Sequence, residues 1–316
     1  MHCFAMRAVL AQARTGVARV NITEMGAHYH CSVKMIGRSD GRSAVACAAY
    51  RSGERLHDER YAKEHNYAPR RGVTQTGILA PKDAPQWAFN REALWNRAEA
   101  VEKRKDAQVA REFELALPHQ VSADVRVALV EEFISQELIP RGMIVDYAIH
   151  SPNGRGDDRN WHAHLMTTLR PLEAGDFSRM KDRDACTQEM VCHWRQAWAE
   201  LQNRTFERLK VRGEDGGILR ADHRSYEEQG IGQEPTLHMG VLATAMERHG
   251  IPTEIGELNR EIVAANAGIP IRRHTQAMGR GQILTQISPP PDAIAQFNEA
   301  LEAELRRVRD ERGFEL

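Results

Sequence analysis

The sequence has few cysteines and no long apolar run, and both absences narrow its class. Its 316 residues include five cysteines, an odd number at irregular spacings, so a disulfide framework is not expected and the thiols fit a reducing cytosol better. No stretch approaches the roughly 18 to 20 apolar residues that a membrane span needs. Residues 1–27 contain no apolar segment between a basic region and a small-residue cleavage site. We therefore expect a globular cytoplasmic protein that is not inserted into a membrane.

An excess of charge of either sign is also lacking. Lysine and arginine number 43 against 44 aspartates and glutamates, for a net charge of −1, so composition by itself does not indicate a nucleic-acid partner. The distribution is uneven, because basic residues crowd one early region: Arg38, Arg42, Arg51, Arg55, Arg60, Lys63, Arg70 and Arg71. Arg272, Arg273 and Arg280 form a second basic group. Such a stretch is more often a solvated face, and it gains functional meaning only beside a site that handles phosphate.

The chain is long enough for one large domain with an appendage. Residues 1–27 lack clear periodicity, and Met25 directly precedes the first convincing strand, which makes it a candidate translation start. We expect the main domain over residues 28–235. A mostly helical extension is expected over 236–316, with its last helix at 292–312 after a run of prolines.

Hydrophobic periodicity predicts both strands and helices in the main domain. Strands are expected at 28–35, 112–117, 143–150 and 162–168. Helices are expected at 44–53, 90–105, from 122 onward, and at 187–211, with Ser43 and Ser122 as N-caps. Residues 54–72 are polar and irregular. This order favours an α+β fold in which an antiparallel sheet carries helices on one face.

Two histidines separated by one residue are the most informative feature of the chain. Alternate side chains of a strand share a face, so His162 and His164 are expected to point together while Ala163 and Leu165 face the core. The preceding strand ends at His150, and the polar connection can return the chain antiparallel, which brings up a third imidazole. Three neutral imidazoles suit Zn, Mn, Fe or Ni and leave coordination positions open for substrate. A polar surface strand is the alternative interpretation.

A tyrosine can be a nucleophile when a neighbouring cation stabilises its phenolate and the substrate is held in line. Tyr50 is the candidate, because it lies on an alanine-rich helix behind the arginine-bearing loop, where small neighbours allow another backbone to approach. Tyr29, Tyr61 and Tyr67 compete with it, and sequence spacing does not eliminate them.

Two glutamates share one face of an expected strand. One carboxylate of the pair Glu112 and Glu114 could fix the tautomer of a metal-bound imidazole, and the other could act as a base near the nucleophile. We expect Glu114 to lie closer to the metal. The alternative is a solvent-facing strand edge.

Five segments occur in order between about residue 28 and about residue 250: YHCSVK, GRSDGRSAVACAAYRSGERL, REFELALP, AIHSPNGRGDDRNWHAHL and DHRSYEEQGIGQEPTLHMG. Together they resemble a plasmid mobilisation relaxase of the MobA/MobL type. The resemblance implies a metal-dependent enzyme, with an HUH-type sheet and flanking helices, that nicks one DNA strand at an origin of transfer. Such an enzyme becomes covalently attached to the 5′ phosphate.

By position, the resemblance makes Tyr50 the nucleophile, and it makes His150, His162 and His164 the ligands of a divalent metal, Mg²⁺ or Mn²⁺. Glu112 and Glu114 match the acidic strand of the family, whereas Trp161 replaces its usual proline. The implied partners are single-stranded and hairpin DNA at an origin of transfer, accessory mobilisation proteins and a coupling protein. The arginines expected to contact DNA are Arg38, Arg42, Arg51, Arg224, Arg272 and Arg273.

Two other functional classes stay open. A three-histidine hydrolase acting on something other than DNA would use water in place of Tyr50. An accessory protein would bind DNA through the same fold without catalysis. Rolling-circle initiators fit less well, because they carry the tyrosine after the histidine pair, whereas Tyr50 precedes His162.

Overall fold

The chain forms two compact units in the computed structural model. The described residues are 27–152, 158–213 and 216–268. Unit 1 ends at His223 and unit 2 begins at Arg224, whereas the sequence placed the boundary after Pro235. The helix expected over 292–312 lies outside the described residues.

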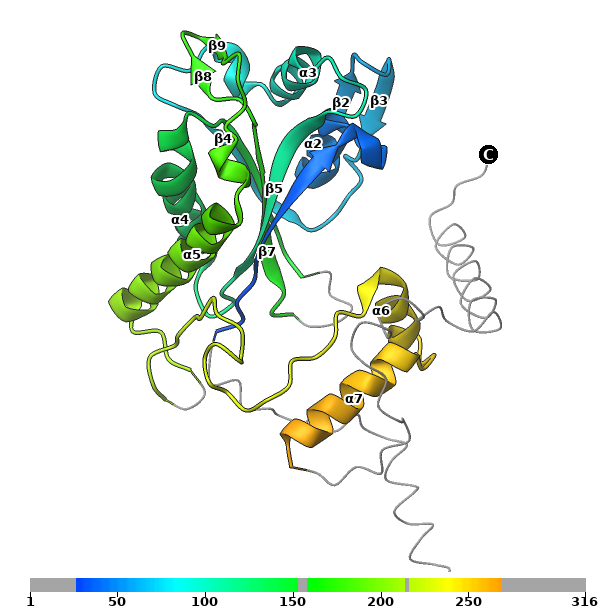
Figure 1. Cartoon of the computed structure of the whole chain (residues 1–316), viewed down its shortest axis with the longest axis vertical. Helices are drawn as coiled ribbons and strands as arrows, with labels where there is room; N and C mark the ends of the chain where they lie inside the picture. The colour runs from blue at the N-terminus through cyan, green and yellow to red at the C-terminus, as the bar shows by residue number, and fades with distance from the viewer. Residues whose placement is uncertain (1–26, 153–157, 214–215, 269–316) are drawn as a thin grey trace, which may run out of the picture. The chain divides into compact units, whose positions relative to one another are not determined.

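Unit 1 is built around a five-stranded sheet with the order β1-β5-β7-β6-β4, in which every neighbouring pair is antiparallel. The strands are β1 (Cys31–Gly37), β4 (Val73–Leu79), β5 (Gln108–Leu117), β6 (Val145–His150) and β7 (Trp161–Thr167). The α+β fold with an antiparallel sheet and flanking helices is confirmed (Figure 1).

One face of this sheet is apolar and is covered by two helices. Phe113, Leu165 and Tyr147 form one cross-strand row, and each is at most 2% exposed. The Phe113 ring meets Trp194 edge to face, with 4.8 Å between the ring centroids. Burial of such large side chains supplies most of the driving force for this layer. The helices are α4 (Ala123–Phe133) and α5 (Gln188–Leu209).

The opposite face is also covered, at one end, so the prediction of helices on one face only was wrong. Ile144 and Met166 of this face are buried in a second apolar cluster with Val45 and Trp95. The indole Nε1 of Trp95 donates to Asp146 at 2.8 Å, so this layer buries a carboxylate together with its donor. Two helices cover this end of the face, α2 (Ala44–Ser52) and α3 (Arg91–Val101). The small alanine side chains of α2 allow it to lie close to the sheet.

Residues 54–72 are not irregular throughout, as the sequence had suggested. They contain the hairpin of β2 (Arg55–Asp58) and β3 (Lys63–Asn66), and β4 follows as an edge strand of the main sheet. Polar side chains outnumber apolar ones in the hairpin, so it shows no alternation. In β4, a Cβ at Gly77 would lie 2.7 Å from the ring of Tyr147. Glycine is therefore needed where that ring crosses the strand.

Five shorter elements and a second small hairpin complete unit 1. They are η1 (Arg38–Asp40), η2 (Gln86–Phe89), η3 (Ile134–Leu138), η4 (Ile139–Arg141), η5 (Asp184–Cys186), and the pair β8 (Leu172–Glu173) and β9 (Asp176–Phe177). Ser43 and Ser122 cap α2 and α4 as predicted. The four cysteines of the described residues are free thiols.

Unit 2 contains α6 (Gly240–Arg248) and α7 (Glu254–Asn266). Thr253 caps α7, and its backbone N–H donates to Glu247 of α6 at 2.6 Å. This contact joins the two helices. Among the residues described, no helix combines the length and the apolar character that crossing a membrane requires.

Candidate metal centre and nucleophile

Strand register brings the three predicted histidines together. His150 of β6 and His162 of β7 are direct cross-strand partners, and His164 follows two residues later on the same face. The intervening Ala163 is fully buried on the other face, as predicted. The three ring centroids are 5.0 to 5.2 Å apart, close to an equilateral triangle. One nitrogen of each ring lies within 4.8 Å of the others, so a single cation could be reached by all three.

Each imidazole has an oxygen acceptor on the nitrogen that it would not use for a metal. Nδ1 of His164 lies 2.9 Å from Glu112 Oε1, and Nδ1 of His162 lies 3.0 Å from the Asn160 carbonyl. Nε2 of His150 lies 2.7 Å from the Arg51 carbonyl. A ring nitrogen facing such an oxygen carries the proton, so the second nitrogen keeps its lone pair. This is the arrangement that metal-binding histidines need, and the donor set fits a divalent cation.

Burial keeps two of these rings neutral. It lowers the pKa of His150 to about 4, and the charge of His164 adds to the effect. The pKa of His162 is lowered for the same main reason. A neutral imidazole is the form that binds metal, so these two rings are available to a cation at neutral pH.

The acidic strand contributes one carboxylate to this cluster. Glu112 is 5% exposed, and it accepts hydrogen bonds from both His164 and Nε of Arg51. Burial alone would raise its pKa, but these two donors outweigh burial and hold the pKa at about 2. Glu112 therefore stays ionised and orients His164. So low a pKa makes it a poor base.

Glu114 is the more exposed of the two and forms an ion pair with Lys34 at 3.3 Å. The expectation that Glu114 lies closer to the metal was wrong. Both carboxylates share a face, but Glu112 lies diagonally opposite His164 under the cover of α2, whereas Glu114 extends to the edge strand β1.

Tyr50 lies in the last turn of α2, which ends where Gly53 adopts the left-handed conformation at φ 68°. Its side chain is 48% exposed. The next residue, Arg51, contacts the histidine cluster twice, through its carbonyl to His150 and through its guanidinium to Glu112. The helix that carries Tyr50 is therefore fixed to the histidine cluster and its carboxylate partner.

The structure places the three competing tyrosines in different surroundings. The Tyr29 hydroxyl donates to the Arg195 carbonyl at 2.7 Å, and burial raises its pKa well above the usual range. Tyr61 lies in the turn between β2 and β3 and is 52% exposed. Tyr67 packs edge to face on Tyr50, with 5.2 Å between the ring centroids. Tyr29 is thereby unsuited to attack a substrate.

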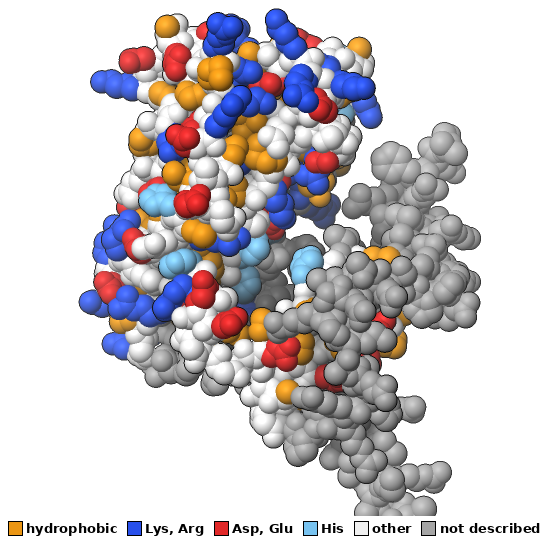
Figure 2. Space-filling model, in the orientation of Figure 1, with side chains coloured by type: hydrophobic (Ala, Val, Ile, Leu, Met, Phe, Trp, Pro, Cys, Tyr) orange, Lys and Arg blue, Asp and Glu red, His pale blue; other side chains and the backbone are white. Residues whose placement is uncertain are grey.

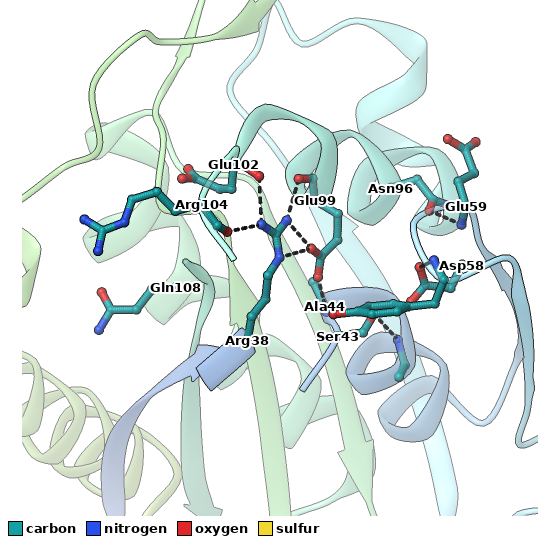
Figure 3. Close-up of polar contacts among 12 residues, drawn as sticks. Arg38, Ser43, Ala44, Asp58, Glu59, Asn96, Glu99, Glu102, Arg104 and Gln108 are labelled. Atoms are coloured by element: carbon teal, nitrogen blue, oxygen red, sulfur yellow. Dashed lines mark hydrogen bonds and ion pairs between the residues drawn. The ribbon is translucent and has the colours of Figure 1, made fainter. Parts of the chain in front are cut away.

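Arg38 is not available to DNA, contrary to the prediction. It is 7% exposed, and its guanidinium forms an ion pair with Glu99 while also donating to the carbonyls of Glu99, Glu102 and Arg104 (Figure 3). The second carboxylate oxygen of Glu99 accepts from the backbone N–H of Ala44. Arg38 thus ties the end of β1 to α3, and through Glu99 to the start of α2.

The other predicted DNA-contacting arginines lie in different surroundings. Arg42 is exposed in the loop before α2, and Arg51 is committed to Glu112. Arg224 belongs to unit 2, whereas Arg272 and Arg273 lie outside the described residues. Basic and acidic side chains are interspersed over the visible face, with no single basic field among the residues described there (Figure 2).

The sequence did not predict two groups that lie at the site. The Asn160 carbonyl orients His162, a backbone role that carries no residue signature. Arg70 places its guanidinium 3.8 Å from the centroid of the Tyr50 ring. It was one of a crowd of arginines, and sequence spacing gave no reason to separate it from its neighbours.

Known proteins are similar to this chain in sequence and in fold. A model of the MobA/MobL family matches residues 42–249. The conjugal transfer protein TraA of Rhizobium radiobacter is 38% identical over 243 residues, which cover 69% of this chain and 22% of that protein. The mobilization protein MobL of Acidithiobacillus ferridurans is 32% identical over 249 residues, which cover 70% of this chain and 64% of that protein.

The chain spans 22 to 24% of the length of the TraA proteins that it matches. A solved structure described as "Molecular Basis of Vancomycin Resistance Transfer in Staphylococcus aureus" has 33% sequence identity and a TM-score of 0.55, over 63% of this chain and 99% of that one. The resemblance seen in the five sequence segments is thus confirmed. The chain belongs to the MobA/MobL family.

Proposed function

We propose that this chain nicks one DNA strand at an origin of transfer, with Tyr50 as the nucleophile and a divalent metal held by His150, His162 and His164. The observation that carries the proposal is that Arg51 contacts His150 through its carbonyl and, through its guanidinium, Glu112, the carboxylate that orients His164. Arg51 follows Tyr50 directly. The same turn of helix therefore carries the exposed phenol and makes the contacts with the residues that could hold a cation. A hydrolase that used water would have no need of this link.

The reaction balances without a further reactant. The Tyr50 oxygen forms a bond to phosphorus as the bond to the 3′ oxygen breaks, and the proton lost by the phenol is matched by one taken up at the 3′ oxygen. A bound cation would neutralise charge on the non-bridging phosphate oxygens. Glu112 and the Asn160 carbonyl fix the orientation of the rings that would hold it. Since a phosphotyrosine diester keeps much of the energy of the original bond, the 3′ hydroxyl can attack it in turn, and nicking should stop at an equilibrium mixture.

The proposed partners follow from this reaction. They are single-stranded and hairpin DNA at an origin of transfer, together with accessory mobilisation proteins and a coupling protein that would deliver the covalent complex. Plasmid DNA places the reaction in the cytoplasm. Arg42 is the exposed arginine nearest in sequence to the start of α2, and it is the proposed phosphate contact of that loop.

A covalent adduct distinguishes this function from the alternatives. The test incubates the chain with labelled single-stranded oligonucleotides that tile the DNA flanking its coding sequence, with Mn²⁺ or Mg²⁺ and in parallel with a chelator. Denaturing electrophoresis should show a metal-dependent, protease-sensitive adduct with one oligonucleotide. Cleavage without an adduct would favour a metallohydrolase, and binding without cleavage would favour a silent accessory protein.

A further inference from the structure

Arg70 is a cation beside the site that has no acidic partner among the described residues. Two other arginines near α2 are paired, Arg51 with Glu112 and Arg38 with Glu99. Arg70 is half-buried. Within the described part of the chain it contacts the Tyr50 carbonyl and the Tyr50 ring, and it contacts no carboxylate. Holding a guanidinium partly out of water without an anion is unfavourable, so an anion that reached Arg70 would be stabilised there.

The side chain of Arg70 lies against the ring of Tyr50, the proposed nucleophile. Its Cζ is 3.8 Å from the centroid of the Tyr50 ring, and Nη1 donates to the Tyr50 carbonyl. Two residues further along the chain, the Gly72 carbonyl accepts a hydrogen bond at 2.8 Å from the backbone N–H of Ser151, the residue that follows His150. The guanidinium therefore contacts the proposed nucleophile, and the segment that follows Arg70 is fixed beside the end of β6, which carries His150.

We propose that Arg70 is a catalytic residue of the nicking reaction, whose guanidinium contacts a non-bridging oxygen of the scissile phosphate. This inference rests on the proposed function. A guanidinium stacked on a ring by its face keeps the N–H groups at its edge for other acceptors. Among the residues that the structure describes, only Nη1 of the Arg70 guanidinium donates to an acceptor. Its planar fork matches a phosphate geometrically. Charge that develops on the phosphate would then meet a donor already in position, at the point where the Tyr50 oxygen attacks.

The test uses the full 316-residue chain and the oligonucleotide with which it forms an adduct. Arg70→Ala should lower the single-turnover rate of adduct formation by about 10²- to 10³-fold, the loss typical of removing one such donor. Arg70→Lys should recover part of the rate, because it keeps the charge but not the fork. The matched control is Arg71→Ala, which removes an exposed neighbouring arginine and should leave the rate unchanged. Thermal unfolding checks that each variant is folded.

A second substrate separates contact with the phosphate from mere support of Tyr50. A methylphosphonate at the scissile position removes the negative charge that Arg70 would meet. On this substrate Arg70→Ala should lose less than about 10-fold, because no anion is left for the cation to stabilise. An equal loss on both substrates would assign Arg70 a purely supporting role and overturn the inference, as would a wild-type rate for Arg70→Ala on ordinary DNA. If the wild-type chain forms no adduct with any oligonucleotide, the proposed function fails, and this inference fails with it.

Discussion

The carbonyl oxygen of Arg51 accepts a hydrogen bond from Nε2 of His150 at 2.7 Å. This contact joins α2, which carries Tyr50, to strand β6, which lies between β7 and the edge strand β4. It also fixes the tautomer of His150, because the nitrogen that donates cannot also bind a cation. The orientation of a proposed metal ligand and the position of the proposed nucleophile therefore depend on the same peptide group.

Loss of either paired histidine should abolish tight metal binding. His162→Ala and His164→Ala are each expected to weaken Mn²⁺ binding by more than about 100-fold, since losing a ligand exceeds the ~10- to 100-fold cost of losing an outer partner. The measurement is isothermal titration calorimetry. His193→Ala is the control, because that imidazole lies on α5 and pairs with Glu137. Unchanged affinity in both cluster variants would mean that the pair is structural.

The two glutamates of β5 should differ in effect. Glu112→Gln removes the carboxylate that orients His164 and pairs with Arg51, so a ~10- to 100-fold loss of Mn²⁺ affinity is expected. Glu114→Gln breaks only a solvent-exposed pair with Lys34 and should change the affinity little. Calorimetry on both variants decides between them. Equal affinities, or a larger loss for Glu114→Gln, would contradict the assignment.

The histidine cluster could be predicted because it depends on local pattern. Alternation along a strand places His162 and His164 on one face, and a short antiparallel return brings His150 opposite them. The capped start of α2 was equally local, since Ser43 needs only the backbone N–H of Ala46. Features whose cause lies within a few residues can be predicted from one sequence.

The features that the sequence did not predict depend on residues that are far apart in the chain. Arg38 was expected at the DNA, but Glu99, 61 residues away, buries it. Glu112 and Glu114 look alike in the sequence, and the position of α2 over the sheet separates them. Strand β4 escaped detection because Gly77 accommodates the Tyr147 ring of its neighbour and so interrupts the apolar pattern.

Burial of Arg38 predicts a loss of stability instead of a loss of DNA binding. Arg38→Ala leaves the Glu99 carboxylate buried without its cation, in a pair whose side chains are each 1% exposed. A loss of about 3 to 5 kcal/mol in the free energy of unfolding is therefore expected. Urea unfolding followed by circular dichroism measures it.

Arg42→Ala is the matched control, because Arg42 is exposed and should change stability by less than about 0.5 kcal/mol. It should instead weaken binding to single-stranded DNA and reduce the salt slope by roughly 0.7 for each phosphate that the variant no longer neutralises. Fluorescence anisotropy across a salt series measures both the affinity and the slope. A stable Arg38→Ala variant with a reduced slope would restore Arg38 to the DNA interface.

The buried thiol of Cys31 should make the fold sensitive to alkali. Burial raises its pKa from 9.0 to about 12, so between these values the unfolded chain has lost a proton that the folded chain keeps. The contribution is complete below pH 9 and is lost as the pH rises toward 12, at up to about 1.4 kcal/mol per pH unit. In urea unfolding, the free energy of unfolding of Cys31→Ala should decline less steeply between pH 9 and pH 12 than that of the wild type. Parallel curves for the two proteins would exclude this role for Cys31.

The central claim is that Tyr50 becomes covalently joined to DNA, and Tyr50→Phe tests it most directly. The variant loses only the phenolic oxygen of an exposed side chain, so its unfolding temperature, Mn²⁺ affinity and DNA affinity should match those of the wild type. Tyr61→Phe, which changes another exposed tyrosine, is the control and should form the adduct normally. Denaturing electrophoresis with the oligonucleotide that the wild type cleaves should show no adduct for Tyr50→Phe. An adduct formed by Tyr50→Phe at the wild-type rate would contradict the account and make Tyr61 or Tyr67 the candidate.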